Sequence, residues 1–203
     1  MKKNTAFTGE KHLDDKRTMI LGAAKKVFSE KSYFEATLEN ISDVSGVKKS
    51  TIYYYFRSKF ELLVNILETT IHEAEENFHT IDCSRDDKKA VLADIIEAHC
   101  RFMEEKKDVI LIIQRAGFDF LHHLEVKKRI DQILEKMKKL RWEVGQRIGP
   151  LQTLSGKRVS GEQVLRLILP SLAGYYIEEI KENRLLSPDV RTLFQEIFTA
   201  FLR

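Results

Sequence analysis

The sequence predicts an all-α fold of about nine helices. Only 3 prolines and 9 glycines occur among 203 residues, so few positions interrupt a regular backbone. Apolar residues recur with the three- and four-residue spacing of amphipathic helices, and no strand-like alternation lies between turn-forming pairs. With 43% hydrophobic residues, the chain can bury a sizeable core as one large domain or two small ones.

The first predicted helix follows a polar segment, residues 1–13, which we expect to be a mobile tail. Asp14 and Asp15 provide an acidic helix start, where the positive end of the helix dipole favours carboxylates. Apolar residues then recur on one face, and the helix is expected to end near Lys31.

Two shorter helices follow, joined by a glycine. Thr37 suits the N-cap of the second predicted helix, and Gly46 ends that helix after barely two turns. The third predicted helix begins near Lys48 and carries Ile52 and Phe56 inward. This order is typical of a helix-turn-helix, in which the second helix of the motif can lie in the major groove of DNA.

The remainder predicts a bundle of longer helices. Ser58 suits the N-cap of a fourth helix, and Gly149 with Pro150 ends the seventh. Residues 151–160 are expected to be a loop, and Ser187 begins the ninth helix. The apolar spacing places these helices at residues 58–78, 91–102, 109–121, 130–148, 164–180 and 188–201.

Charge is unevenly divided along the chain. The formal net charge of +3 conceals a basic front, because residues 1–59 hold 12 basic and 7 acidic side chains, whereas residues 60–203 hold 22 and 24. Such an asymmetry favours a module that contacts nucleic acid joined to a separate partner or effector domain. We therefore expect a tail at residues 1–13, a helix-turn-helix DNA-binding domain at 14–59, and an effector-binding and dimerisation domain at 60–203.

Several classes of protein lack support in the sequence. No apolar run approaches the roughly 18 residues that span a membrane, so we expect no membrane partner and a cytoplasmic location. Cys83 and Cys100 stand 17 positions apart, which suits neither a disulfide scaffold nor a four-ligand zinc site. Phosphate-binding loops, nucleophile elbows and zinc-protease motifs are absent from the sequence. We expect no catalytic residues, no metal and no cofactor, and the protein is not predicted to be an enzyme.

The third predicted helix departs from ordinary helix design. Lys48 and Lys49 lie at the positive end of the helix dipole, which disfavours cations by roughly 0.3–1 kcal/mol each. Three consecutive tyrosines, residues 53–55, spread around the helix axis, so they cannot all be buried. Ammonium groups neutralise phosphates, and hydroxyl groups contact phosphates or base edges. The segment therefore favours contact with DNA; the alternative is a solvated corner beside partly buried tyrosines.

Residues 28–63 resemble the DNA-binding region of the tetracycline-repressor (TetR) family of bacterial transcription regulators. The matching residues, in order and without a gap, are Phe28, Thr37, Ile41, Gly46, Val47, Ser50, Thr51, Ile52, Tyr53, Tyr54, Tyr55, Phe56, Ser58, Lys59 and Leu62. The chain departs from the family pattern at Lys48, where a serine usually caps the helix. No preference for particular operator bases is therefore implied.

The resemblance implies roles for individual residues. It implies base or groove contacts from the third helix, by Lys49, Ser50 and Tyr53, with Lys48 and Thr51 near them. It implies phosphate contacts at the helix ends, by Thr37, Tyr55 and Lys59. For Thr37 the helix cap is a compatible second role.

A lone helix-turn-helix makes few phosphate contacts, so we expect a two-fold dimer that reads half-sites about 34 Å apart, or a multiple of that distance. The eighth and ninth helices carry more apolar surface than one chain can cover, and the family packs these helices as a four-helix bundle. The predicted interface residues are Leu165, Leu169, Leu172, Tyr176, Leu193, Ile197 and Phe201. The alternative for each of them is the core of a single chain.

The family also places an effector pocket in the helical body. The aromatic and aliphatic residues there fit an elongated, largely apolar ligand with one polar or anionic end, for which Arg115 is the expected partner. The candidate lining residues are His99, Phe102, Met103, Arg115, Phe118, Trp142, Tyr175 and Tyr176. The alternative for each aromatic residue is the core, and Arg115 has Asp119 as an alternative partner one turn away.

Together these implications give one expected function. The chain is expected to be a sequence-specific DNA-binding transcriptional regulator, a homodimeric repressor that a small-molecule effector releases from palindromic, double-stranded operator DNA. Two alternatives stay open. One is a helix-turn-helix protein without a small-molecule effector, either protein-regulated or architectural, and the other is an activator.

Overall fold

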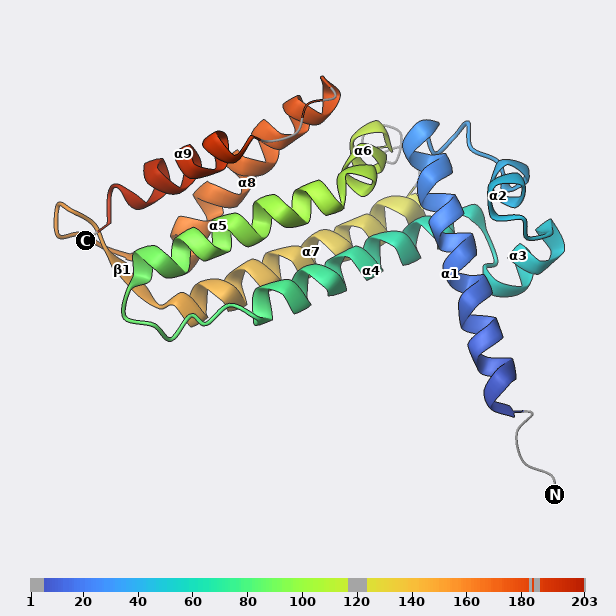
Figure 1. The fold of residues 1–203 in the computed structure, drawn as a ribbon, viewed down its shortest axis with the longest axis horizontal. Coiled ribbons are helices and arrows are strands. Elements are labelled where there is room, and N and C mark those ends of the chain that lie inside the picture. Colours follow the sequence, from blue (N-terminus) through green and yellow to red (C-terminus); the bar gives the residue numbers. More distant parts are fainter. Residues whose placement is uncertain (1–5, 117–123, 183, 185–186, 203) are drawn as a thin grey trace. The chain divides into compact units, whose positions relative to one another are not determined.

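The structure, a computed structural model, describes residues 6–116, 124–182, 184 and 187–202. Within these residues the chain forms nine helices and one hairpin (Figure 1). The elements are α1 (Ala6–Glu30), α2 (Leu38–Ser45), α3 (Lys49–Tyr55), α4 (Lys59–His79), α5 (Lys88–Glu105), α6 (Lys107–Ala116), α7 (Leu124–Ile148), β1 (Pro150–Gln152), β2 (Arg158–Ser160), α8 (Gly161–Lys181) and α9 (Pro188–Thr199). The predicted all-α fold is confirmed.

The chain divides into two compact units. The N-terminal unit comprises residues 1–69 and 111–129, and the C-terminal unit comprises residues 70–110 and 130–203. The first division lies inside α4 and differs from the expected boundary after residue 59. The reason is that the first turns of α4 belong with α1: Arg17 donates a hydrogen bond to Asn65 over 2.5 Å, and Leu62 and Leu63 are fully buried.

The start of α1 also differs from the expectation. The sequence predicts a tail at residues 1–13 and a helix from Asp14, whereas α1 begins at Ala6. Residues 6–13 contain no proline, and adding turns to a helix that packing already holds costs little free energy compared with starting one. The expected tail is therefore corrected for residues 6–13.

The core of the N-terminal unit forms where three helices meet. Ile20, Ala24 and Phe28 recur every fourth residue on one face of α1 and are fully buried. Ile41 of α2 and Ile52 of α3 are buried to the same degree. Each such aliphatic side chain contributes roughly 1.5–3 kcal/mol by leaving water, which holds the two short helices in place.

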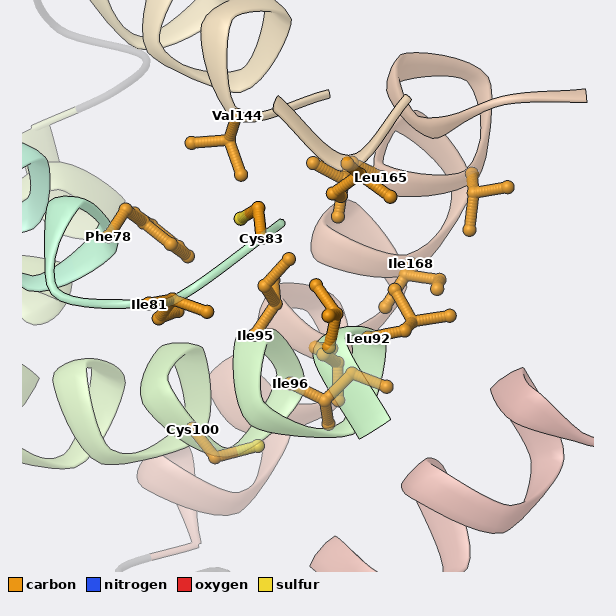
Figure 2. Packing of buried hydrophobic residues seen from close by; sticks show 14 of the residues in the cluster. Phe78, Ile81, Cys83, Leu92, Ile95, Ile96, Cys100, Val144, Leu165 and Ile168 are labelled. Carbon is orange, nitrogen blue, oxygen red and sulfur yellow. The ribbon is translucent and has the colours of Figure 1, made fainter. Parts of the chain in front are cut away.

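The core of the C-terminal unit centres on α5. Leu92, Ile95 and Ile96 of this helix are fully buried and lie among side chains of α7 and α8, including Val144 and Leu165 (Figure 2). Both cysteines belong to the same cluster and are free thiols. Burial raises the pKa of the Cys100 thiol to about 11, which makes it an inert core residue.

Two glycines allow α7 and α8 to approach closely. A Cβ atom on Gly145 of α7 would lie 2.5 Å from the backbone nitrogen of Glu162, and one on Gly161 would lie 2.5 Å from the carbonyl oxygen of Gly145. Both distances are shorter than a Cβ atom tolerates, so this crossing requires glycine at each position.

The segment between α7 and α8 forms a short hairpin, where the sequence predicts only a loop. Strand β1 pairs antiparallel with β2, with Leu151 opposite Val159. Three residues per strand are too few to show the alternation by which a strand is recognised in a sequence. The backbone N–H of Leu154 also donates to the carbonyl of Phe201, which fixes the end of α9 to the hairpin.

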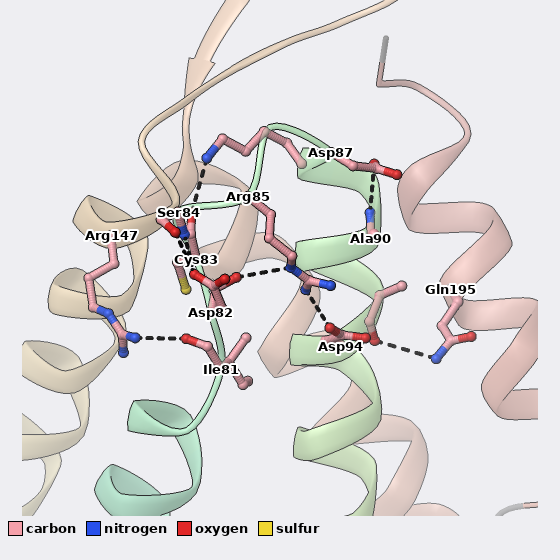
Figure 3. A network of polar contacts seen from close by, with 12 residues as sticks. Ile81, Asp82, Cys83, Ser84, Arg85, Asp87, Ala90, Asp94, Arg147 and Gln195 are labelled. Carbon is pink, nitrogen blue, oxygen red and sulfur yellow. Dashed lines mark hydrogen bonds and ion pairs between the residues drawn. The ribbon is translucent and has the colours of Figure 1, made fainter.

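Hydrogen bonds and ion pairs from three arginines also join the helices of the C-terminal unit. Arg147 of α7 donates to the carbonyl oxygen of Phe78 over 3.1 Å. It also donates to the carbonyl oxygen of Ile81 over 2.8 Å, and Arg85 pairs with Asp94 of α5 (Figure 3). A further arginine, Arg191 of α9, pairs with Glu97 and Glu104 of α5. The last two pairs join α9 to α5 in the same unit.

Candidate nucleic-acid interface

The turn between α2 and α3 has the geometry of a helix-turn-helix. Gly46 ends α2 in the left-handed conformation with a φ of 67°, and its N–H donates to the carbonyl of Ser42 over 2.9 Å. The Ser42 hydroxyl donates to the carbonyl of Val47 over 2.8 Å, and the Val47 N–H donates to the Ser45 hydroxyl. These local bonds fix the angle at which α3 leaves the turn.

Helix α3 presents a cationic, hydroxyl-bearing and aromatic surface. Ile52 is buried, whereas Lys48, Lys49, Ser50 and Tyr53 are exposed. Lys48 occupies the N-cap position, where the family usually has serine, and makes no side-chain cap bond within the described part of the chain.

Thr37 fulfils the predicted capping role. Its hydroxyl accepts a hydrogen bond from the N–H of Asn40 over 3.1 Å, and the Asn40 side chain accepts one from the N–H of Thr37 over 3.2 Å. This capping box fixes the start of α2. The residue is also exposed, so a phosphate contact by Thr37 stays a prediction.

An ion pair that the sequence analysis missed joins α2 to α3. The Lys49 ammonium group donates to the carboxylate of Glu39, which lies in the first turn of α2. This hydrogen bond holds the pKa of the Glu39 carboxyl below its usual value and raises the pKa of Lys49. Ten positions separate the two residues, so a helical spacing rule cannot find the pair.

Lys59 has a different role from the one predicted. Its ammonium group donates to the carbonyl oxygens of Tyr33 and Ala36 over 2.6 and 2.8 Å and lies 4.5 Å from the centre of the Tyr33 ring. Burial lowers the pKa of Lys59. The predicted phosphate anchor is therefore corrected to an internal tie that holds the segment between α1 and α2, because the loop carbonyls take up its donors.

The three tyrosines of α3 are not all buried, as the sequence predicts. The most exposed of them, Tyr54, is missing from the predicted DNA contacts. Tyr54 is 76% exposed, Tyr53 is 50% exposed, and Tyr55 is half-buried. The rings of Tyr54 and Tyr55 meet edge to face with their centroids 5.3 Å apart. Tyr54 therefore joins the candidate contacts, and the signal that could have found it is the 100° step between neighbouring helical residues.

The candidate effector residues lie in different environments. Met103 and Tyr176 are buried in the C-terminal unit, whereas His99 and Phe102 are half-buried. Burial lowers the pKa of His99 to about 4, so its ring is neutral at pH 7. The His99 Nε2 atom and the Tyr176 hydroxyl are buried without a hydrogen-bond partner. Such unpaired groups suit an interior that admits water or a ligand.

Three other candidates are corrected, and one is not described. Trp142 is 54% exposed and Tyr175 is also exposed, so both side chains lie at the surface. Arg115 is exposed as well and donates to the carbonyl of Ser29 near the end of α1. Carbonyl groups in the last turn of a helix attract cations, which accounts for this contact. Phe118 lies outside the described residues.

The predicted interface residues fall into two sets. Leu165, Leu172 and Tyr176 are buried within the single chain, so the structure corrects them from interface to core. Leu169 is half-buried against that core. Leu193 and Ile197 of α9 and Phe201, just beyond its end, remain exposed on the surface. Leu167 of α8, which the prediction missed, is exposed as well.

A surface hollow of about 330 Å³ lies in the C-terminal unit beside the start of α5. It is lined by Thr80, Ile81, Asp82, Arg85, Asp94, Glu97, Ala98 and Arg101. The lining is largely charged and shares no residue with the predicted apolar pocket. Because Arg85 already pairs with Asp94 there, the hollow is not a match for the predicted apolar effector.

The fold and the surface of α3 define a helix-turn-helix protein of the DNA-binding class. Residues 20–66 match the family model for bacterial regulatory proteins of the tetR family, which identifies the helix-turn-helix part of the chain as a TetR-type DNA-binding region. The members of this family found by comparison are regulators rather than enzymes, in agreement with the expectation that the chain is not an enzyme. Within the described residues, no helix has the length and apolar character needed to cross a membrane.

Individual relatives are distant. The chain is 30% identical over 91 residues to the HTH-type transcriptional activator FasR of Mycolicibacterium smegmatis. The aligned residues cover 45% of this chain and 42% of FasR. It is 27% identical over 139 residues to the HTH-type transcriptional regulator YfiR of Bacillus subtilis. Here the aligned residues cover 64% of this chain and 66% of YfiR. The chain therefore spans less than two thirds of the length of these relatives.

The fold also resembles a solved structure. The crystal structure of the transcriptional regulator FadR from Bacillus subtilis in complex with stearoyl-CoA has a TM-score of 0.68, covering 89% of this chain and 95% of that chain. The sequence identity is 17%, so this likeness shows the fold alone.

Proposed function

We propose that the protein is a sequence-specific DNA-binding transcriptional regulator that acts in the cytoplasm as a homodimeric repressor. The observation that carries the proposal is the exposed face of α3, where Lys48, Lys49, Ser50 and Tyr53 follow a glycine-ended turn. These residues supply cations for phosphates and hydroxyl and ammonium donors for base edges. Thr37, Tyr55 and the added Tyr54 flank this face as candidate contacts.

The surface of α8 and α9 supports the dimer. Leu167 is 70% exposed, and Leu193 and Ile197 are each more than half exposed. Large apolar side chains gathered on neighbouring helices mark a surface that a partner covers. A second copy of the chain is the proposed partner, because a two-fold dimer presents two recognition helices to a palindromic site.

A small, largely apolar effector is the proposed signal. The interior of the C-terminal unit is apolar around the unpaired Nε2 atom of His99 and the unpaired hydroxyl of Tyr176. A neutral imidazole and a phenol suit a polar group on an otherwise apolar ligand. FadR of Bacillus subtilis, whose fold is similar, was crystallised with stearoyl-CoA, so this compound is the first probe to use.

The proposed switch is a shift between two populations. The empty protein favours the state that binds the operator, and the effector binds better to a state that does not, so each ligand weakens the other. Residues 111–129 belong to the same compact unit as α1 to α3, and Arg115 of α6 contacts Ser29 of α1. A change in α6 would therefore reach the DNA-binding helices through a direct contact.

The experiment begins with selection of an operator from a random duplex library, followed by anisotropy titrations with and without stearoyl-CoA. A repressor of the proposed kind enriches a palindrome and binds it more weakly when the acyl-CoA is present. Failure to enrich any sequence would refute the DNA-binding proposal. An alternative outcome is a palindrome that is enriched but bound with the same affinity in the presence of stearoyl-CoA and of any co-purifying molecule identified by mass spectrometry. That result would refute the small-molecule effector and leave the protein-regulated alternative.

A further inference from the structure

Glu39 is an acidic residue on the surface that is proposed to face DNA. It lies two residues after Thr37 in the first turn of α2, and its carboxylate accepts a hydrogen bond from Lys49 at the start of α3. Both side chains are exposed, to 61% for Glu39 and 45% for Lys49. The pair therefore bridges the two helices of the motif on their solvent side.

The ion pair between Glu39 and Lys49 adds little to the stability of the fold. An exposed ion pair contributes little to the free energy of unfolding, because water screens both charges. A carboxylate in this place also repels DNA phosphates and so lowers the affinity for any sequence. Glu39 therefore weakens the general attraction to DNA while it holds Lys49 at the start of α3.

The geometry of the Lys49 ammonium group allows the ion pair to contribute to recognition of a DNA sequence. A lysine ammonium has three N–H donors, and the bond to Glu39 occupies one of them. The remaining two stay available beside the first turn of α3. Guanine presents two acceptors, O6 and N7, on its major-groove edge, and lysine is a common partner for them. Because the carboxylate cancels the charge of Lys49, the pair has little attraction for phosphates, which carry no sequence information.

We propose that Glu39 is a specificity-determining residue that positions Lys49 for a guanine edge and withholds its charge from phosphates. Glu39 acts through Lys49 and is thus a positioning residue rather than a base-contacting one. This inference rests on the proposed DNA-binding function, because it concerns only a protein that distinguishes one DNA sequence from another.

Three variants test the proposal. E39Q removes the charge and keeps the size of the side chain. D43N is the matched control, because Asp43 is exposed one turn further along α2, outside the pair with Lys49, and the change in net charge is the same. The double variant E39Q/K49Q removes both charges and leaves the net charge unchanged. Circular dichroism checks that each variant is folded.

Binding is measured by fluorescence anisotropy over a series of salt concentrations. One probe is the duplex enriched by selection with the wild-type protein, and the other is a random-sequence duplex of equal length. We expect E39Q to bind the random duplex about threefold more tightly at low salt, because an unpaired Lys49 can contact a phosphate, with a salt slope steeper by about 0.9. Its affinity for the selected duplex does not rise, so the ratio of the two affinities falls at least threefold.

The other two variants separate positioning from net charge. D43N shifts both affinities alike, so its affinity ratio equals that of the wild type. The double variant keeps the wild-type salt slope on the random duplex, but its affinity ratio falls about tenfold, because the base contact of Lys49 is lost.

An equal change of the affinity ratio in E39Q and D43N would overturn the inference, as would an unchanged ratio in the double variant. Failure of the proposed function gives a different result. In that case the selection with the wild-type protein enriches no sequence, before any variant is compared.

Discussion

The ammonium group of Lys59 lies among backbone carbonyls of the segment that joins α1 to α2. A charged donor in this position satisfies acceptors that the turn leaves open, and it does so from the first residue of α4. The same lysine therefore connects the start of α4 to the segment between α1 and α2. Its contribution is to the shape of the helix-turn-helix rather than to the charge presented to DNA.

Replacing Lys59 with methionine should destabilise the protein by about 1–2 kcal/mol, because hydrogen bonds from a charged group are lost and the carbonyls of Tyr33 and Ala36 remain. Chemical denaturation measures this change in the free energy of unfolding. Lys48→Met is the control, since Lys48 is exposed and its loss should change stability by less than about 0.5 kcal/mol. Equal effects of the two substitutions would contradict the assigned role.

His99 should make the stability of the protein depend on pH below neutrality. Its pKa is about 4 in the folded protein, against an ordinary value of 6.5 for a solvated histidine, so the unfolded chain takes up a proton that the folded protein excludes. Stability is therefore lost as the pH falls from about 6.5 to 4, by up to about 3 kcal/mol at 1.36 kcal/mol per pKa unit. Above pH 6.5 this residue contributes no pH dependence.

Urea denaturation of His99→Gln at a series of pH values checks this expectation. The variant should show a flatter dependence between pH 4 and 6.5 than the wild type. His72→Gln, on the exposed face of α4, is the matched control for removing an imidazole. A profile of the His99 variant that parallels the wild type would show that the ring is accessible to protons.

Close contact between α7 and α8 is decided by their glycines. A methyl group at Gly145 would meet the backbone of Glu162, which cannot move aside as a flexible side chain does. The hairpin of β1 and β2 joins these two helices within a few residues, so the crossing also fixes where the hairpin lies.

Gly145→Ala should therefore destabilise the protein by about 2–3 kcal/mol, as overpacking of a close contact does. Gly22→Ala is a control with the opposite sign. Gly22 lies inside α1, and nothing lies within 4 Å of the added Cβ atom, so the higher helix propensity of alanine should stabilise by about 0.5–1 kcal/mol. Thermal unfolding of both variants gives the comparison, and stabilisation by both would exclude a tight crossing.

Local signals explain which elements the sequence could predict. Thr37 caps α2 and Gly46 ends it through bonds that span five residues or fewer, so residue type alone indicates both. The partners of Lys59 lie 23 and 26 positions away and are backbone atoms, which carry no residue-specific signal. Helix α8 is apolar nearly all round, so its sequence could not separate the buried Leu165 from the exposed Leu167.

For the molecule as a whole, the apolar surface on α8 and α9 has the largest consequence. Isolated exposed apolar residues need no explanation, but several on adjacent helices do. Leu165 and Leu172 lie on the face of α8 that packs in the core with α5. Leu167 and the exposed side of α9 are therefore left for a second copy.

The double substitution of Leu193 and Ile197 by glutamate should convert the dimer to a monomer. Two carboxylates would have to leave water on association and enter an apolar face, which is costly for a charged group. Sedimentation velocity at micromolar concentration measures the change, and operator affinity should fall with it. Leu134→Glu, on the exposed surface of α7, should leave the dimer intact. A wild-type protein that sediments as a monomer would contradict the proposed assembly.

The contact between Arg115 and Ser29 bears on how such regulators can be recombined. The unit that carries the DNA-facing helices is not one continuous stretch of chain, because residues 111–129 belong to it and Arg115 and Arg129 contact α1 and α4. A chimera made by cutting after residue 69 would carry the recognition helix to a new body but leave these two arginines behind. Modular exchange of sensing and DNA-reading parts therefore has to transplant two pieces of gene rather than one.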